Sequence, residues 1–231
     1  MNYSSASKKS LGEQAYEQIR EAIITLQFKP GQMVYESELG ARLGMSRTPV
    51  REGIRMLLME DLIEVLPQRG MRVSLISQAK VEDIRFVRES LEVSAFRQVA
   101  GQWHQDDKGF ALAGKQLTNL LEEQRAAGQE GDVLAFLNLD EAFHRLIMEQ
   151  TRNHTLIAVV SQMRSHLNRV RLLGLRGSSS MESLVNEHQS MLNAIMNNDE
   201  ATTVQILTYH LRRLRADLAP LHAKFPDYFI D

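Results

Sequence analysis

The sequence has no cysteine among its 231 residues. Disulfide bonds, thiol catalysis and thiolate metal ligands are therefore excluded together, and the absence fits a reducing compartment. No segment approaches the roughly 18 consecutive apolar residues that a membrane-spanning helix needs. The polar start, MNYSSASKKS, is not followed by the apolar run of a secretion signal. We therefore expect a cytoplasmic protein without a membrane partner.

The sequence also lacks a strong charge of one sign. Its net charge is −2, and the first 78 residues carry ten Lys and Arg against nine Asp and Glu. A strongly basic domain would have indicated nucleic acid directly, so that conclusion must come from the positions of individual arginines. The apolar share of 43% is enough for a buried core, and the length allows one large domain or two smaller ones.

The first 77 residues carry signals for three short helices followed by a β-hairpin. Apolar residues recur at helical spacing after the capping box Ser10-x-x-Glu13, and a second helix fits Glu36 to Leu43. Gly44 supplies a tight turn into MSRTPVREGIRMLLMED, a third helix that Ser46 can cap. Two β-rich runs then surround the turn PQRG. This order predicts a winged helix-turn-helix.

From residue 78 onward the signals are helical. Six helices are expected, at about 79–102, 106–126, 130–151, 154–173, 181–197 and 199–218. The loop GLRGSSS is the clearest break, and Ser179-x-x-Glu182 offers a capping box at its end. The prediction is a mainly α fold, with a winged helix-turn-helix over residues 1–77 and an antiparallel six-helix bundle over residues 78–231. In such a bundle, ligand sites face the interior.

The third helix begins with arginines one turn apart, Arg47 and Arg51. In a helix-turn-helix, the first residues of the second helix meet base edges in the major groove, and a guanidinium can bond to O6 and N7 of guanine. A hairpin tip with Arg and Gly can reach the neighbouring minor groove. We predict DNA contacts from the two helices and the hairpin tip, made by Ser37, Ser46, Arg47, Thr48, Arg51, Arg69 and Gly70.

A solvated surface is the alternative for each of these arginines. Glu52, Glu60 and Asp61 could pair with them on an exposed helix face. That alternative is the better one for any single arginine, but the whole arrangement of turn, helix and hairpin favours DNA binding. Arg55, two turns into the helix, is interpreted as a phosphate contact or a surface ion pair.

Four side chains of metal-ligating type fall inside apolar helical stripes of the bundle. Asp140 and His144 are four residues apart, so they point the same way from adjacent turns. His188 and His210 lie inside the stripes of two later helices. A carboxylate that faces a core is costly unless it is paired or bound to a metal. We predict that these four residues hold one divalent cation: Zn²⁺, Ni²⁺, Mn²⁺ or Fe²⁺.

A core histidine with a hydrogen-bond partner is the alternative for each of these positions, and for one histidine alone it is the commoner case. Convergence from three helices, with an aspartate in the set, favours a metal. His166 lies near another apolar face, and we interpret it as a residue that lines the ligand pocket or supports the metal ligands.

Both parts of the sequence resemble one known family. YESELGARLGMSRTPVREGIRMLLMEDLIEVLPQRGMRV is similar to the DNA-binding domain of the GntR family of bacterial transcription regulators, with SRTPVRE and QRG as its most specific parts. VRESLEVSAFRQVA, DEAFH, NEHQSMLNAI and ATTVQILTYHLRR resemble the FCD effector-binding domain of the FadR-like subfamily. Six bundle helices rather than seven favour its smaller, VanR-like branch. Gly53 stands where the family usually has alanine, and it should weaken the helix.

The resemblance implies that Arg47, Arg51 and Gly70 contact the operator and that the four-residue set ligates a metal. In relatives, an arginine near the start of the bundle meets the carboxylate of the effector; Arg88 is the candidate, and an ion pair with Glu92 is its alternative. The expected function is a homodimeric transcription regulator that binds double-stranded operator DNA. A small carboxylate effector bound near the metal would change its operator affinity.

Two alternatives to this function remain. In one, the metal itself is the signal and the protein is a metal sensor. In the other, the bundle is a metalloenzyme, but the di-iron type normally needs carboxylates on four helices, and the constellation here has one acidic residue. No Ser/His/Asp set and no phosphate-binding glycine loop is apparent either.

Overall fold

The computed structural model describes residues 9–175 and 180–230, and these form two compact units. The first comprises the described residues up to Ile76 together with Asp227–Ile230, and the second comprises Ser77–Pro226. Each unit has its own hydrophobic core. The chain therefore passes from the first unit into the second and returns to the first at its C-terminal end.

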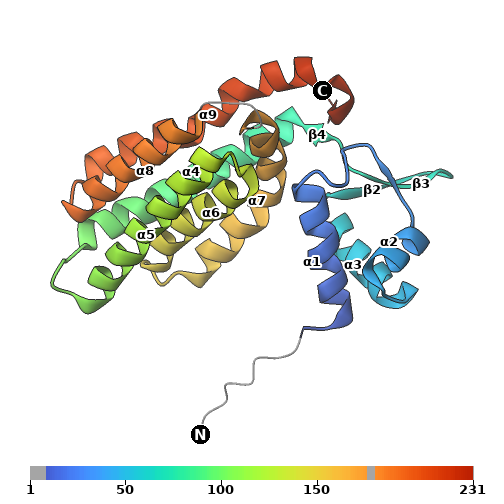
Figure 1. The fold of residues 1–231 in the computed structure, drawn as a ribbon, viewed down its shortest axis with the longest axis horizontal. Coiled ribbons are helices and arrows are strands. Elements are labelled where there is room, and N and C mark those ends of the chain that lie inside the picture. The colour runs from blue at the N-terminus through green and yellow to red at the C-terminus, as the bar shows by residue number, and fades with distance from the viewer. Residues whose placement is uncertain (1–8, 176–179, 231) are drawn as a thin grey trace, which may run out of the picture. The chain divides into compact units, whose positions relative to one another are not determined.

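The first unit is a winged helix-turn-helix (Figure 1). Helices α1 (Leu11–Ile24), α2 (Glu36–Leu43) and α3 (Arg47–Met59) precede the hairpin of β2 (Ile63–Leu66) and β3 (Gly70–Val73). The short strand β1 (Met33–Val34) pairs antiparallel with the other edge of β3, giving the order β1-β3-β2. The apolar stripes of the three helices meet the inner side of this sheet in one core, formed by residues that include Ile19, Ile23, Leu39, Val50, Ile54, Leu57, Ile63 and Val73.

The local signals at the helix ends are only partly as predicted. The capping box of Ser10 and Glu13 is present at the start of α1, and Gly44 ends α2 with a left-handed backbone at φ 64°. The prediction for Ser46 as a side-chain cap was wrong: it occupies the N-cap position of α3, but its hydroxyl accepts no capping bond. Its exposed hydroxyl is consequently available for another partner.

Helices fill the second unit over the described residues, as the sequence predicts. They are α4 (Gln78–Gln102), α5 (Lys108–Glu130), α6 (Val133–Glu149), α7 (His154–Leu175), α8 (Ser180–Met196) and α9 (Glu200–Lys224). Their core is rich in aromatic and branched side chains, including Phe96, Trp103, Leu117, Phe143, Ile147, Ile195 and Leu207. The predicted capping residue Ser179 lies outside the described residues. Among the described helices, none is long and apolar enough to span a membrane.

The C-terminal end of α9 leads into the turn η1 (Pro226–Tyr228) and strand β5 (Phe229–Ile230). Strand β5 pairs with β4 (Ile76–Ser77), which directly precedes α4. Phe229 is buried. The sequence predicts a last helix that ends near residue 218 with no strand after it, whereas α9 continues to Lys224 and β5 follows.

Candidate nucleic-acid interface and candidate metal centre

The start of α3 presents its predicted DNA-contacting residues to solvent. Ser46, Arg47 and Thr48 are all exposed. Arg51 is exposed as well, but its guanidinium donates two hydrogen bonds to Glu36 of α2, at 2.9 and 2.7 Å. The structure therefore fixes the direction of Arg51 with a bidentate pair. Arg47 has no acidic partner within 4.0 Å in the described part of the chain, so the N–H groups of its guanidinium are available to DNA.

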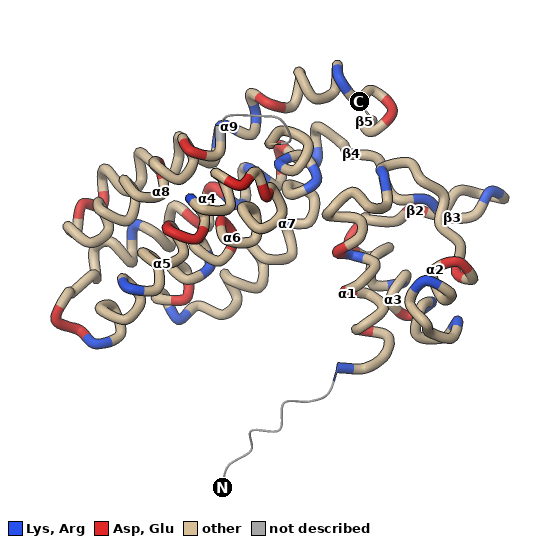
Figure 2. Tube along the Cα trace, viewed as in Figure 1, with Lys and Arg blue, Asp and Glu red and all other residues tan. Residues whose placement is uncertain are grey.

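The other predicted contacts lie at the first turn of α2 and at the hairpin tip. Ser37 is exposed at the second position of α2. Arg69 and Gly70 are exposed at the turn between β2 and β3, and Figure 2 shows basic charge at this tip. Gly70 has φ 102°, a conformation that side chains rarely adopt, so glycine is required by the turn itself. The turn alone therefore accounts for a glycine at this position, whether or not Gly70 also contacts DNA.

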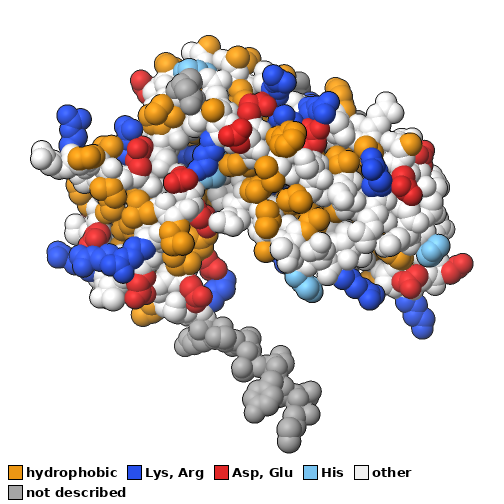
Figure 3. All heavy atoms as spheres, turned by 180° about the vertical axis from the view of Figure 1, so that it is seen from behind, with side chains coloured by type: hydrophobic (Ala, Val, Ile, Leu, Met, Phe, Trp, Pro, Cys, Tyr) orange, Lys and Arg blue, Asp and Glu red, His pale blue; other side chains and the backbone are white. Residues whose placement is uncertain are grey.

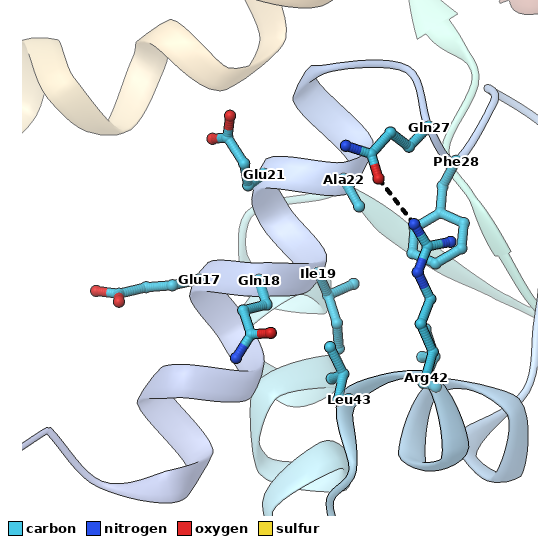
Figure 4. A pocket seen from close by; sticks show the side chains of 10 residues that line it. Glu17, Gln18, Ile19, Glu21, Ala22, Gln27, Phe28, Arg42 and Leu43 are labelled. Atoms are coloured by element: carbon cyan, nitrogen blue, oxygen red, sulfur yellow. Dashed lines mark hydrogen bonds between the residues drawn. The ribbon is translucent and has the colours of Figure 1, made fainter.

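A hollow of about 460 Å³ also lies between α1 and α2 in this unit, lined by Phe28, Leu39 and Arg42 among others. Figure 4 shows Arg42 lying against the Phe28 ring, 4.6 Å from its centroid, and bonded to Gln27. The wall of this hollow that α1 forms carries Glu17 and Glu21. Carboxylates on this wall repel phosphate, so the hollow is not a DNA surface.

In the second unit the four predicted metal-ligating residues come together. Asp140 and His144 lie on α6, His188 on α8 and His210 on α9. One ligand atom from each lies within 4.8 Å of every other. The first three are fully buried and His210 is 6% exposed. The helical stripes thus bring a carboxylate and three imidazoles to one point inside the bundle.

The hydrogen bonds of the three histidines orient the rings toward that point. Nδ1 of His144 lies 2.7 Å from Glu92, Nδ1 of His188 lies 2.9 Å from Gln124, and Nδ1 of His210 lies 2.9 Å from Glu187. Ionised carboxylates and the amide oxygen only accept, so each Nδ1 carries the proton. The lone pairs of the three Nε2 atoms are left facing one another.

These Nε2 atoms are close together, at 3.3 Å between His144 and His188 and 3.3 Å between His188 and His210. Two unprotonated Nε2 atoms cannot hydrogen bond to each other. A cation between them would stabilise this convergence, and histidines whose other nitrogen donates to an oxygen are the usual arrangement at metal sites. The donor set therefore fits a divalent cation.

Asp140 supports the same conclusion. Its carboxylate is fully buried, and Oδ2 has no hydrogen-bond partner among the described residues. Arg171 of α7 lies 2.6 Å from Oδ1 and forms an ion pair with it. Burial opposes the charge of Asp140, yet Arg171 and the neighbouring histidines hold its pKa well below the usual range. A buried anion whose Oδ2 has no hydrogen-bond partner among the described residues is suited to a metal.

Glu92 connects the metal-ligand cluster to a group of buried arginines. It accepts from Nδ1 of His144 and from Nε of Arg88 at 2.7 Å each, and Arg164 of α7 lies 3.5 Å away. Burial raises the pKa of Glu92, but Arg88 and His144 outweigh this and place it well below the ordinary value. Glu92 is therefore an anion at neutral pH, which holds the His144 proton on Nδ1.

The predicted effector residues lie at different distances from this cluster. Arg88 is paired with Glu92, as its alternative interpretation stated, and it also lines a cavity of about 110 Å³ with Arg171 and His210. Both interpretations of Arg88 are thus compatible with one side-chain position. His166 is buried on α7, where its Nδ1 lies 3.2 Å from Arg169, but it does not line that cavity.

Several residues around the metal-ligand cluster are not identified by the sequence pattern. Gln124, Glu187 and Arg171 contact the metal-ligand cluster, and Glu92 was considered only as a partner of Arg88. A signal existed for Gln124, because it follows the stripe of Leu117 and Leu121 on α5 at helical spacing and is fully buried. For Arg171, nothing in the residue spacing distinguishes it from Arg164 and Arg169 on the same helix.

On the face drawn in Figure 3, acidic and basic side chains are interspersed over the helical unit. A surface of mixed sign does not form the basic stripe that a nucleic-acid footprint requires. This face of the helical unit accordingly offers no second DNA surface, and DNA contact remains with the first unit.

Comparison with known proteins covers both units. The FCD domain family matches residues 83–213, and the family described as bacterial regulatory proteins, gntR family, matches residues 11–73. An uncharacterized HTH-type transcriptional regulator in an unstable DNA locus of Streptomyces ambofaciens is 31% identical over 214 residues, which cover 93% of this chain and 87% of the relative. The transcriptional repressor RspR of Escherichia coli (strain K12) is 26% identical over 219 residues, covering 95% and 93%.

Two solved structures share the fold. The E. coli protein McbR/YncC superposes with a TM-score of 0.78 at 20% identity, over 94% of this chain and 100% of that one. A GntR regulator from Rhodococcus sp. RHA1 gives a TM-score of 0.71 at 19% identity, over 91% and 99%. At these identities the likeness shows the fold alone.

Proposed function

Because the chain belongs to the GntR family of bacterial regulators that carry an FCD domain, we propose that it is a homodimeric repressor-type regulator whose operator affinity responds to a small carboxylate bound beside a metal. It is a DNA-binding transcription regulator and not an enzyme. The six bundle helices of the described residues support its place in the FadR-like subfamily and the VanR-like branch. It acts in the cytoplasm, where operator DNA is found.

The first unit reads the operator. Arg47 reaches guanine in the major groove, Arg51 is held by Glu36 for a base or phosphate contact, and the wing tip with Arg69 approaches the minor groove. Ser37, Ser46 and Thr48 bond to phosphates. Two-fold symmetry of a homodimer would match a near-palindromic operator with two half-sites. Operator binding then weakens steeply as salt increases.

One observation carries the metal part of the proposal: the ligand atoms of Asp140, His144, His188 and His210 lie within 4.8 Å of one another in a buried place. Three nitrogens and one oxygen suit Zn²⁺, Ni²⁺, Mn²⁺ or Fe²⁺. When bound there, the metal supplies a positive charge and open coordination positions for a carboxylate. Arg88 lines the adjoining cavity, and the buried His166 of α7 contacts Arg169 on the same helix.

The effector changes operator affinity only to the extent that it binds two dimer geometries with different free energies. We infer that effector binding shifts α9, because this helix carries His210 and continues into β5 of the DNA-binding unit. The distance between the two recognition helices would change with it.

Metal analysis of the purified chain tests the central point. We expect about one divalent ion per chain, a content that His188→Ala removes and that the exposed His154→Ala retains. Equal metal content in the wild-type chain and in His188→Ala would refute the assignment of the cluster.

An operator titration then separates the effector-responsive regulator from a metal sensor. The protein is stripped with EDTA, and zinc is returned at constant ionic strength. Operator binding that persists without metal, with only the response to small acids lost, supports a docking role for the metal. Operator affinity that follows zinc alone identifies a metal sensor instead.

A further inference from the structure

The middle residue of the wing tip, Gln68, has a backbone conformation that a side chain disfavours. Leu66 and Gly70 are the last paired residues of β2 and β3, so Pro67, Gln68 and Arg69 form a three-residue loop. The N–H of Arg69 donates to the carbonyl oxygen of Leu66 at 3.0 Å, and Gln68 has φ 62°. With a proline before it, Gln68 occupies the third position of a type II turn, which favours glycine or asparagine. Glutamine is less favourable there than either of these residues.

The other left-handed residues that are not glycine have a structural explanation. Among the described residues they are Leu26, Asp61, Arg152 and Asn198, and each lies two or three residues after the end of a helix. A left-handed residue at such a position ends the helix and provides hydrogen bonds for its last carbonyl groups. Gln68 lies between two strands and ends no helix, so this explanation does not apply to it.

Contacts within the chain do not explain the choice of glutamine either. Gln68 is exposed, as are its neighbours Pro67 and Arg69. Over residues 9–175 and 180–230, no hydrogen bond to the amide of Gln68 is present. A disfavoured backbone that is kept at an exposed side chain without internal partners indicates a role in binding. The amide is therefore available to the DNA that the wing approaches.

The chemistry of the minor groove gives this amide a role that the neighbouring arginine cannot perform. An A·T pair presents acceptors alone in the minor groove, whereas a G·C pair adds the N2 amino group of guanine as a donor. The guanidinium of Arg69 only donates, and it responds mainly to the negative potential of a narrow groove. The amide of Gln68 both donates and accepts. It can therefore distinguish a groove edge with the amino group from an edge without it.

Resting on the operator reading proposed above, we propose that Gln68 is a base-reading residue whose amide distinguishes G·C from A·T in the minor groove under the wing. The discrimination applies to a base pair at the flank of each half-site. Arg69 adds charge at the same place without reading this difference. Gln68 thus adds to the major-groove contacts of Arg47 and does not replace them.

Inosine in place of guanine tests this proposal, because inosine lacks the N2 amino group and leaves the major-groove edge of the base pair unchanged. Operators are first selected from a random pool with the full chain. Fluorescence anisotropy then compares G·C, I·C and A·T at each flanking base pair. At one flanking pair, I·C and A·T should bind within about 2-fold of each other, and both should differ from G·C by about 5-fold or more.

Two substitutions separate the amide from the backbone. Gln68→Met keeps the length of the side chain but has no amide, so G·C and I·C should bind within about 2-fold of each other. Its salt dependence should equal that of the wild type, since glutamine carries no charge. Gln68→Gly should lose the discrimination as well, and its thermal midpoint should be no lower than that of the wild type, because glycine accepts φ 62° freely.

Arg152→Gly is the matched control. Arg152 is exposed and left-handed at φ 57°, but it lies in the second unit. This substitution changes the same backbone conformation away from the wing, so discrimination between G·C and I·C should remain.

Three outcomes overturn the proposal. In the first, the wild type binds G·C and I·C equally at every flanking pair. In the second, the discrimination survives in Gln68→Met, which would assign it to Arg69 or to the width of the groove. In the third, Gln68→Gly lowers the thermal midpoint, which would show that glutamine is kept for folding. A chain that selects no sequence from the pool contradicts the proposed operator reading, whereas one that selects a sequence but ignores inosine contradicts this inference alone.

Discussion

Nδ1 of His188 lies 2.9 Å from Oε1 of Gln124, so a side chain on α5 orients a histidine on α8. Both residues are fully buried. Since α5 contributes no metal-ligating residue to the cluster, its part is to fix the ring and to keep the proton on Nδ1. Glu92 and Glu187 do the same for the two other histidines.

Replacing Gln124 by methionine removes this acceptor and keeps a similar volume. The Nδ1–H of His188 then has no partner and its ring is free to turn, which should weaken zinc binding by about 10- to 100-fold. Competition with a chromophoric chelator measures the affinity. Gln116→Met is the matched control, because Gln116 is exposed on the same helix. Equal zinc affinity for wild type and Gln124→Met would show that the orientation of His188 does not depend on α5.

Replacing Arg47 by alanine should remove sequence preference and leave metal and effector binding unchanged. A guanidinium paired with guanine contributes about 1–3 kcal/mol of discrimination, so affinity for a selected operator should fall about 10- to 100-fold and affinity for random DNA much less. Operator sites selected from a random pool provide the ligand, and fluorescence anisotropy measures binding.

Arg55→Ala is the control for this substitution, since Arg55 is exposed two turns further along α3. Its loss should weaken operator and random DNA by similar factors and lower the salt dependence by about one charge. If Arg47→Ala behaves in the same way as Arg55→Ala, Arg47 is a phosphate contact and not a base reader.

The stability of the first unit should depend on pH through the titration of Tyr16. Its hydroxyl on α1 donates to Glu60 at the end of α3, and burial, with this bond, raises the pKa of Tyr16 to about 12. An unfolded chain titrates its tyrosines near 10. The pKa of Tyr16 is higher in the folded chain than in the unfolded chain. The neutral hydroxyl therefore contributes fully to the free energy of unfolding below about pH 10, and this contribution is lost as the pH rises toward 12.

Phenolate absorbance of the folded chain measures this directly, because one of its five tyrosines should titrate about two pH units late. The late step should be missing in Tyr16→Phe. A titration curve whose upper part is the same in both proteins would contradict the assignment.

The apolar periodicity of the sequence predicts most of the helices and identifies the ligand residues that face inward. Asp140, His144, His188 and His210 could be placed inside because a 3.6-residue period determines which face a residue occupies. The strand β1, by contrast, has only two residues and depends on pairing with β3, so it has no periodicity to detect. Strand β5 has the same length and pairs with β4, about 150 residues earlier in the chain.

Side-chain pairs between distant helices also escape sequence reasoning. Glu92 and His144 are 52 residues apart, and Gln124 and His188 are 64 apart. Periodicity shows that each faces inward, but not which inward residue it meets. Ser46 shows that even a correct local position does not determine a contact. Serine favours N-caps and Ser46 occupies the N-cap position of α3, but its hydroxyl accepts no hydrogen bond from the backbone of the first turn.

Gly53 is the position where helix propensity and packing give opposite predictions. Propensity alone says that alanine would stabilise α3 by about 1 kcal/mol. In the structure, however, a Cβ at this position would lie 2.7 Å from the backbone nitrogen of Tyr16 and 3.1 Å from the carbonyl carbon of Ala15, both on α1. Backbone atoms of a packed helix cannot move aside singly, so Gly53→Ala should force α1 and α3 apart. The expected cost is about 1–3 kcal/mol, as for other overpacked cores, and the net effect should be destabilising.

Hydrogen exchange followed by mass spectrometry reads this change locally. Peptides from α1 and α3 should exchange faster in Gly53→Ala than in the wild type, while peptides from α5 and α8 should be unchanged. Gly128→Ala is the matched control, because a Cβ there meets Met181 and Phe136 at ordinary distances of 3.5 and 3.6 Å. That substitution should slow exchange in α5 or leave it unaltered. Slower exchange of α1 in Gly53→Ala would show that propensity outweighs the contact, and that the close crossing of the two helices can relax.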